Sequence, residues 1–113
     1  MSQVSVLPTL AELCHVPVAS PLDGASFVQQ IRQPETRSSL PVFAEYNLRN
    51  PQAKYMIRDE YYKFTFWTHD MAELYDLQAD PQEMNNLALA PGHAKTLARL
   101  QEQLFAWYRP PEL

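Results

Sequence analysis

Hydrophobic and polar residues alternate most regularly between residues 42 and 77, and this pattern favours β-strands. The clearest strand covers residues 61–67. Side chains alternate between the two faces of a strand, so Tyr62, Phe64 and Phe66 share one face, and Tyr61, Lys63, Thr65 and Trp67 share the other. Similar patterns predict three further strands at 42–46, 54–58 and 73–77.

A short link joins two of these strands. Only Asp59 and Glu60 separate the strand at 54–58 from the strand at 61–67, so we expect an antiparallel hairpin. Such turns favour positive φ, which glycine adopts most easily. Glu60 is therefore expected to strain this turn or to shift its type.

Apolar residues at helical spacing predict two helices outside the strand region. The first covers 7–14, places Leu7, Leu10, Leu13 and Cys14 on one side, and is stopped by Pro17. The second runs from Pro91 to Tyr108. Its apolar stripe comprises Leu97, Leu100, Leu104 and Trp107, and its polar side comprises Lys95, Arg99, Glu102 and Gln103.

Shorter features lie between these elements. One helical turn is expected around Phe27, Val28 and Ile31, and the proline-bounded segment 33–41 is expected to be a loop. Asp80, Pro81 and Glu83 have the spacing of a helix start, with Asp80 as the N-cap.

Together these elements predict an α+β fold. It consists of a small antiparallel sheet of about four strands packed by a C-terminal helix, plus a short N-terminal helix. We expect residues 1–40 to be a helix with irregular chain, and residues 41–113 to hold the sheet and terminal helix.

Composition excludes several classes of protein. The chain has 113 residues and a net charge of -4, and only 9 are Lys or Arg, which argues against a nucleic-acid partner. No apolar run approaches the length of a membrane span. The N-terminal residues do not resemble a secretory signal, so a chain made as it stands is expected in the cytoplasm, with localisation otherwise open. A single cysteine excludes an intrachain disulfide, and two glycines are too few for a phosphate-binding loop.

Polar residues at two strand ends are candidates for binding. Glu45, Tyr46 and Asn47 end the first strand with a carboxylate, a phenol and an amide, a set that suits the rim of a polar pocket. They equally suit pairing with the loop at Arg49-Asn50-Pro51. His69 follows the most aromatic strand, where it is either a binding group or an ordinary loop residue.

The remaining reactive residues favour structural roles. His15 and His93 have no histidine at metal-binding spacing. Cys14 lies on the apolar side of the first helix, so we expect a buried thiol rather than a nucleophile. The acidic pairs Asp59-Glu60 and Asp80/Glu83 are better explained as a turn and a cap than as acid–base pairs.

The longer motifs resemble the C-terminal region of sulfatases, closest to choline-sulfatase-like bacterial members. Residues 54–64, KYMIRDEYYKF, and 73–88, ELYDLQADPQEMNNLA, are similar to the family string MxRxGxYKY…ELYDLxxDPxExxNLA. Residues 6–13, VLPTLAEL, with Pro17 and the DGASF of 23–27, resemble the family's PTLxxLAGxPxxxxxDGxSL. Residues 42–47, VFAEYN, also have a counterpart. The likeness covers about residues 4–108, in family order.

Three positions depart from the family pattern. Ser5 stands where the family usually has Asp, Cys14-His15 replaces Ala-Gly, and Glu60 replaces the hairpin glycine.

The resemblance implies a sulfuric ester hydrolase whose catalytic parts lie elsewhere. The family uses a formylglycine, made from Cys or Ser in C/S-x-P-x-R, and a calcium ion held in the larger N-terminal domain. CHVPV at 14–18 does not match that motif, because Pro17 comes one place late and arginine is absent. We therefore expect no catalytic residue, no metal site and no cofactor in this chain, and no activity from it alone.

Three hypotheses follow from the resemblance. In the first, residues 1–40 dock on the sulfatase catalytic domain, residues 41–113 form the C-terminal subdomain, and Glu45, Tyr46, Asn47 and His69 line the substrate pocket. In the second, the chain is a free-standing interaction or oligomerisation module, with self-association through the apolar face of Leu7, Leu10 and Leu13. In the third, it completes a separately encoded sulfatase.

Overall fold

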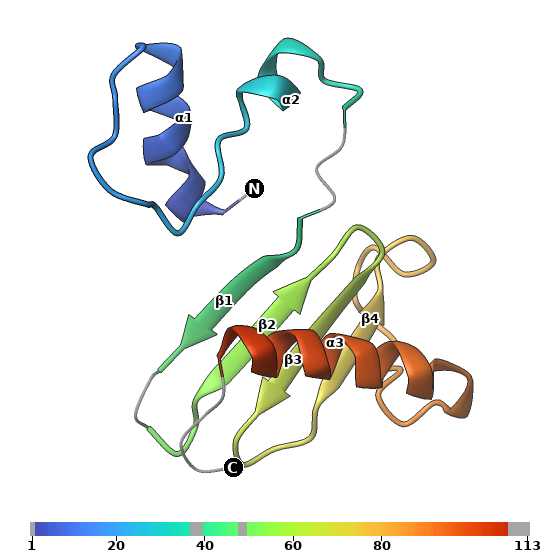
Figure 1. The fold of residues 1–113 in the computed structure, drawn as a ribbon. Helices are drawn as coiled ribbons and strands as arrows, with labels where there is room; N and C mark the ends of the chain where they lie inside the picture. The colour runs from blue at the N-terminus through green and yellow to red at the C-terminus, as the bar shows by residue number, and fades with distance from the viewer. Residues whose placement is uncertain (1, 37–39, 48–49, 109–113) are drawn as a thin grey trace. The chain divides into compact units, whose positions relative to one another are not determined.

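The computed structural model describes residues 2–36, 40–47 and 50–108. The chain divides into two compact units, residues 1–40 and 41–113 (Figure 1).

The first unit consists of three short helical elements: the 3-10 helix η1 (Gln3–Ser5), α1 (Val6–Leu13) and α2 (Val28–Arg32). Thr9 joins them, because its buried hydroxyl donates to the carbonyl of Ser5 (2.6 Å) and accepts the N–H of Phe27 (3.1 Å). Gly24 allows the returning chain to pass close to η1, since an added Cβ would lie 2.1 Å from the carbonyl oxygen of Val4. The helical turn predicted around Phe27, Val28 and Ile31 is confirmed, since α2 covers Val28–Arg32.

The apolar residues of α1 are largely open to solvent. Leu7, Leu10 and Leu13 are 60%, 53% and 42% exposed, whereas the helix buries Thr9 and Ala11. The leucine face identified from the sequence is therefore only partly covered by the described residues.

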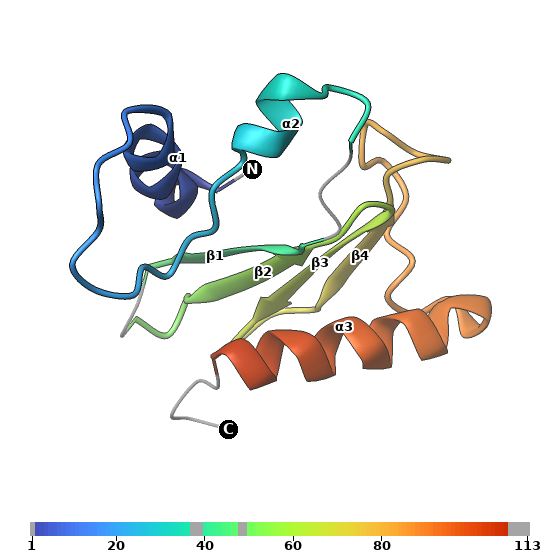
Figure 2. The same ribbon diagram turned by 45° about the horizontal axis from the view of Figure 1, so that its top comes forward.

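The second unit is a four-stranded antiparallel sheet with one long helix. Its strands are β1 (Val42–Tyr46), β2 (Lys54–Arg58), β3 (Tyr62–Trp67) and β4 (Glu73–Asp76), in the spatial order β1-β2-β3-β4. The 3-10 turn η2 (Pro91–His93) leads into α3 (Ala94–Trp107), which crosses one face of the sheet (Figure 2). The predicted α+β architecture is confirmed.

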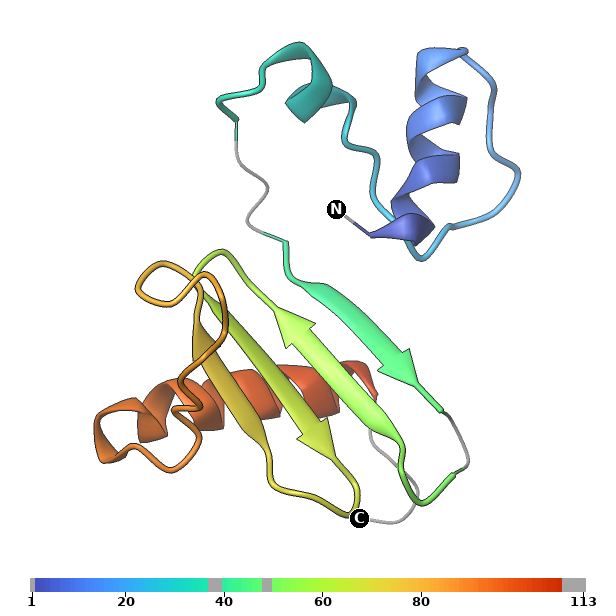
Figure 3. The same cartoon turned by 180° about the vertical axis from the view of Figure 1, so that it is seen from behind.

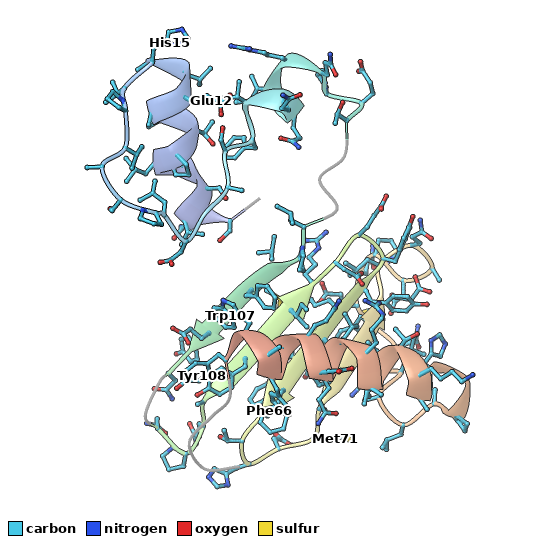
Figure 4. All side chains as sticks on the ribbon, in the orientation of Figure 1. Glu12, His15, Phe66, Met71, Trp107 and Tyr108 are labelled. Atoms are coloured by element: carbon cyan, nitrogen blue, oxygen red, sulfur yellow. The ribbon has the colours of Figure 1, made fainter. Side chains whose placement is uncertain are left out.

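The core of this unit lies between α3 and the sheet. Its buried members are Ala53, Tyr55, Ile57, Phe64, Leu74, Leu100 and Leu104. Aromatic contacts extend it: Phe43 stacks on Trp107 with ring centres 4.8 Å apart, and Phe66 meets Phe105 edge-on at 5.2 Å. Figure 4 labels Trp107 at the C-terminal end of α3 and Phe66 beside the helix. The predicted stripe of α3 thus meets the face of β3 that carries Tyr62, Phe64 and Phe66.

The β2–β3 hairpin corrects the expectation of strain at Glu60. The described non-glycine residues with positive φ are His15, Asn47 and Glu83, and Glu60 is not among them. The turn is closed instead by Asp59, whose Oδ1 accepts the N–H groups of Tyr61 (2.9 Å) and Tyr62 (2.7 Å). An aspartate that holds the backbone in this way makes a glycine unnecessary.

The helix start expected at Asp80 is wrong, although Asp80 does act as a cap. Its Oδ2 accepts the N–H of Asn85 (2.7 Å), and its carbonyl oxygen accepts that of Glu83. Glu83 then adopts φ of 57°, outside the right-handed helical region. The segment is therefore a series of turns rather than a helix.

Asn86 fastens this turn segment to β4. Its Oδ1 accepts the N–H groups of Leu74 (3.0 Å) and Ala88 (3.0 Å), and its Nδ2 donates to the carbonyl of Ala72 (3.1 Å). The N–H of Leu87 donates to the carbonyl of Leu74 (2.8 Å). The outer edge of β4 is thereby covered at Leu74.

The expectation of a buried Cys14 is also wrong, since Cys14 is exposed. It lies just beyond the last residue of α1, where its backbone N–H donates to the carbonyl of Leu10 (2.9 Å). Figure 4 marks Glu12 and His15 at this end of the helix. The side chain lies at the helix end and on a face that the described residues leave open.

Candidate functional site

At one end of the sheet, the last residues of two strands lie beside the first residue of a third. Because β1 and β3 are each antiparallel to β2, they run in the same direction (Figure 3). Their C-terminal ends therefore lie at the same end of the sheet as the first residue of β2. One row of the register at this end of the sheet contains Tyr46, Lys54 and Trp67.

These three residues, here called the ring–lysine cluster, are in contact through their side chains. The Nζ of Lys54 lies 3.6 Å from the ring centre of Trp67 and 5.7 Å from that of Tyr46. Their sequence neighbours Tyr55 and Phe66 face the core and α3. The ring–lysine cluster therefore lies on the sheet face opposite α3.

The four residues singled out in the sequence are all exposed, but they do not all share a face. Tyr46 and Asn47 end β1, and His69 follows β3 by two residues at the same end of the sheet. Glu45 pairs with the core residue Tyr55, so its side chain is directed to the α3 side. Whether these residues line a substrate pocket stays a prediction.

The loops at this end of the sheet are held by local hydrogen bonds. Asn47, with φ of 60°, accepts the N–H of Asn50 on its carbonyl oxygen (3.2 Å). Thr68 donates its hydroxyl to the carbonyl of Pro51 (2.5 Å), which ties the end of β3 to the residues before β2. This backbone bond does not involve the Asn47 side chain, so its pairing with that loop stays a prediction, and Arg49 lies outside the described residues.

Lys54 and Trp67 were not predicted as functional residues. The predicted antiparallel order could have pointed to them, because the first residue of a strand lies beside the last residues of its antiparallel neighbours. The register then decides which side chains meet, and that register follows from the hairpin at Asp59.

The same sheet face carries a second charged pair beside β4. Lys63 forms a 2.5 Å ion pair with Glu83. Tyr75 is the register partner of Lys63. Burial raises the pKa of the Tyr75 phenol, and the nearby charges of Glu73 and Glu83 raise it further. Tyr75 therefore stays protonated at neutral pH.

Two aspartates have lowered pKa values for reasons of turn structure. Burial raises the pKa of Asp59, but hydrogen bonds from Arg99, Tyr62 and Tyr61 outweigh it and leave the pKa below its usual value. The backbone N–H groups of Ala79 and Gln78 lower the pKa of Asp76. Both carboxylates thus stabilise turns.

No metal site is formed by the part of the chain that the structure describes. Among residues 2–36, 40–47 and 50–108, no three His, Cys, Asp or Glu side chains are placed to hold a metal ion. These residues do not fit the calcium site of the family, so no catalytic step through calcium is assigned to them. His93 instead meets the ring of Tyr62 edge-on at 6.2 Å, a packing role.

No helix among the described residues is long and apolar enough to cross a membrane.

A small antiparallel sheet backed by one helix, with turns of the DPxExxNLA type along β4, defines a C-terminal sulfatase region. The chain belongs to the family described as N-sulphoglucosamine sulphohydrolase, C-terminal, whose pattern matches residues 1–109. The family predicted from the motifs is thus confirmed.

Individual relatives agree with this family. The chain is 32% identical over 101 residues to a Δ4,5-hexuronate-2-O-sulfatase of Bacteroides thetaiotaomicron, a match to 84% of this chain and 21% of the relative. It is 34% identical over 94 residues to the choline-sulfatase of Rhizobium meliloti, a match to 80% of this chain and 18% of the relative. The chain therefore spans about a fifth of the length of these relatives.

The fold also matches a solved structure. A crystal structure assigned to a sulfatase of Bacteroides thetaiotaomicron superimposes with a TM-score of 0.80 at 30% identity, over 91% of this chain and 23% of that one. The likeness includes both units, since it covers nine-tenths of the residues.

Proposed function

We propose that this chain serves as the C-terminal part of a sulfatase and acts together with a catalytic domain that it does not contain. Its role is structural, and the end of its sheet where β1 and β3 finish shapes the entrance to the substrate pocket. The match of residues 1–109 to a sulfatase C-terminal family is the observation that carries this proposal.

Two features of the chain support a partner domain. The relatives are about five times longer, so most of a sulfatase has no counterpart in these 113 residues. The leucine face of α1 is largely exposed, and an apolar helix face of this kind is stable in water only when another surface covers it. We assign that cover to the catalytic domain.

A chimera tests the proposal directly. The matching C-terminal segment of the Rhizobium meliloti choline-sulfatase is replaced by this chain, and hydrolysis of choline sulfate is measured with purified protein. A second protein lacks the C-terminal segment entirely. We expect the chimera to be soluble and active, and the truncated enzyme to be inactive or insoluble.

The matched control places a charge in the core of the grafted part. Leu74→Asp in the chimera buries a carboxylate beside Phe64 and Leu100, so it is expected to remove the activity. Equal activity of the truncated enzyme and the chimera would contradict the structural role. Hydrolysis of an aryl sulfate by the purified, calcium-supplied chain alone would contradict the need for a catalytic domain.

The exposed leucines also favour a second candidate, a module that associates with itself. Light scattering of the purified chain separates the two candidates. A stable dimer that Leu7→Glu with Leu10→Glu converts to a monomer would support self-association, and an interface of that kind should bury at least about 1,000 Å². A monomer that binds a separately expressed sulfatase catalytic domain would support a subunit that completes a sulfatase.

A further inference from the structure

We propose that Tyr46, Lys54 and Trp67 form a binding site for a ring that carries an anionic group, such as a sugar or aryl ring bearing a carboxylate or a sulfate. The proposal rests on the proposed function, because it says which residues at the end of the sheet where β1 and β3 finish contact the substrate. It assigns an anion-binding role to Lys54 and a ring-stacking role to Tyr46 and Trp67.

The position of Lys54 is fixed by the sheet rather than by a flexible loop. It is the first residue of β2 and stands between Tyr46 of β1 and Trp67 of β3 in one row of the register. Its ammonium group lies 3.6 Å above the indole ring, a close cation–π contact that holds the side chain in place. A binding group held by two strands in this way is pre-organised.

The charge of Lys54 is not neutralised within the described part of the chain. No carboxylate there lies within 4.0 Å of its Nζ, and Glu45, the nearest acid along β1, is directed to the opposite face. Lys63, on the same face of the sheet, differs because Glu83 pairs with it. An ammonium that rests on ring faces keeps N–H donors for an anion, since ring faces accept the charge without accepting all three protons.

The two aromatic side chains supply the surface for the ring of the ligand. Tyr46 is 67% exposed, so most of its side chain is open to contact. Trp67 is half-buried in β3, and its Nε1 is covered and meets no hydrogen-bond acceptor among the described residues. A flat exposed ring beside a fixed cation matches a ligand that is apolar on one face and anionic at one substituent.

The chain offers a direct reporter for this site. It contains two tryptophans, and the second, Trp107, stacks on Phe43 on the α3 side of the sheet. Their two indole N–H signals in an NMR spectrum of the ¹⁵N-labelled chain therefore report opposite faces. The probe is glucosamine 6-sulfate; glucosamine has the same ring and ammonium group without the sulfate, and sodium sulfate supplies the anion without the ring.

We expect glucosamine 6-sulfate to shift the Trp67 signal in a saturable way while the Trp107 signal stays in place. Glucosamine and sulfate should each bind at least about tenfold more weakly, because each lacks one of the two contacts. Lys54→Met keeps the aliphatic stem and should weaken binding about tenfold or more. Lys95→Met, at an exposed lysine of α3, is the matched control and should leave binding unchanged.

A second variant tests the proposal in case the first one does not fold. If Lys54→Met does not give a folded spectrum, Tyr46→Leu should still weaken binding several-fold, because it removes the stacking ring from an exposed position. The proposal is overturned if both indole signals shift together, if sulfate alone binds as tightly, or if the folded variants bind like the parent chain. An inactive chimera would overturn the proposed function and leave this binding result standing, so the two failures are distinguishable.

Discussion

Asp59 holds the β2–β3 turn, and its substitution tests that role quantitatively. Its Oδ1 accepts two backbone N–H groups, and its Oδ2 accepts a 2.8 Å hydrogen bond from Arg99 of α3. The Asp59 side chain is 17% exposed and that of Arg99 is 47% exposed. The turn contacts are thus more sheltered than the far end of the ion pair.

These contacts set the expected cost of Asp59→Ala. Each lost backbone hydrogen bond is worth about 1 kcal/mol net. The half-exposed ion pair adds about 0.5 kcal/mol. We therefore expect Asp59→Ala to lower the free energy of unfolding by about 2.5 kcal/mol. Asp59→Asn keeps the Oδ1 acceptor and should cost about 1 kcal/mol, and Arg99→Ala should cost about 0.5 kcal/mol.

Urea unfolding followed by tryptophan fluorescence measures these values in the second unit alone, because both tryptophans lie beyond residue 41. The urea midpoint of Asp59→Ala should fall by about 1 M or more. Equal losses for Asp59→Ala and Arg99→Ala would refute the reasoning, since they would show that the ion pair and not the turn carries the stability.

The pH dependence gives a second test of the same residue. The pKa of Asp59 is lowered by folding, so the unfolded chain binds its proton more readily. The stability from the charged carboxylate is therefore fully present above the ordinary pKa of aspartate, 3.8, and is lost as the pH falls through the lowered value. The gap between the parent chain and Asp59→Asn should be constant from about pH 5 to pH 7 and close in stronger acid.

Two further predictions concern the core and the turn segment. Leu100→Ala should lower the free energy of unfolding by about 3 kcal/mol, because Leu100 is completely buried against the sheet; Leu89→Ala, at an 80% exposed position, should change it by less than about 0.5 kcal/mol. Asn86→Ala removes three hydrogen bonds and should cost about 2 kcal/mol in the same urea assay. Asn85→Ala is its neighbouring control and should be nearly neutral, and similar losses for both asparagines would show that Asn86 does not fasten the segment to β4.

Strand positions followed from the sequence because apolar and polar residues alternate along these segments. β1 and β2 have the predicted bounds, and the stripe of α3 packs on the face of β3 that carries Phe64 and Phe66. This alternation can be read within each segment by itself. β3 begins one residue later and β4 ends one residue earlier than predicted, which is the usual uncertainty at element ends.

Two of the errors arose where an aspartate accepts backbone N–H groups a few residues further along the chain. Asp59 removes the need for glycine at position 60, and Asp80 caps a turn with the same residues that would cap a helix. The candidate site was only partly predicted for a different reason. Tyr46 was found because it ends a strand, whereas Lys54 becomes visible only when the register sets it between two rings. Residues from three strands meet by pairing, and no single segment of sequence contains that information.

Asn86 and Leu87 shield part of the outer edge of β4. A row of backbone donors and acceptors at a sheet edge invites further strands, and on the β4 side the protein's own chain already occupies that row at Leu74. A strand added there, whether from an expression tag, a neighbouring molecule or a fused domain, would first have to displace this segment.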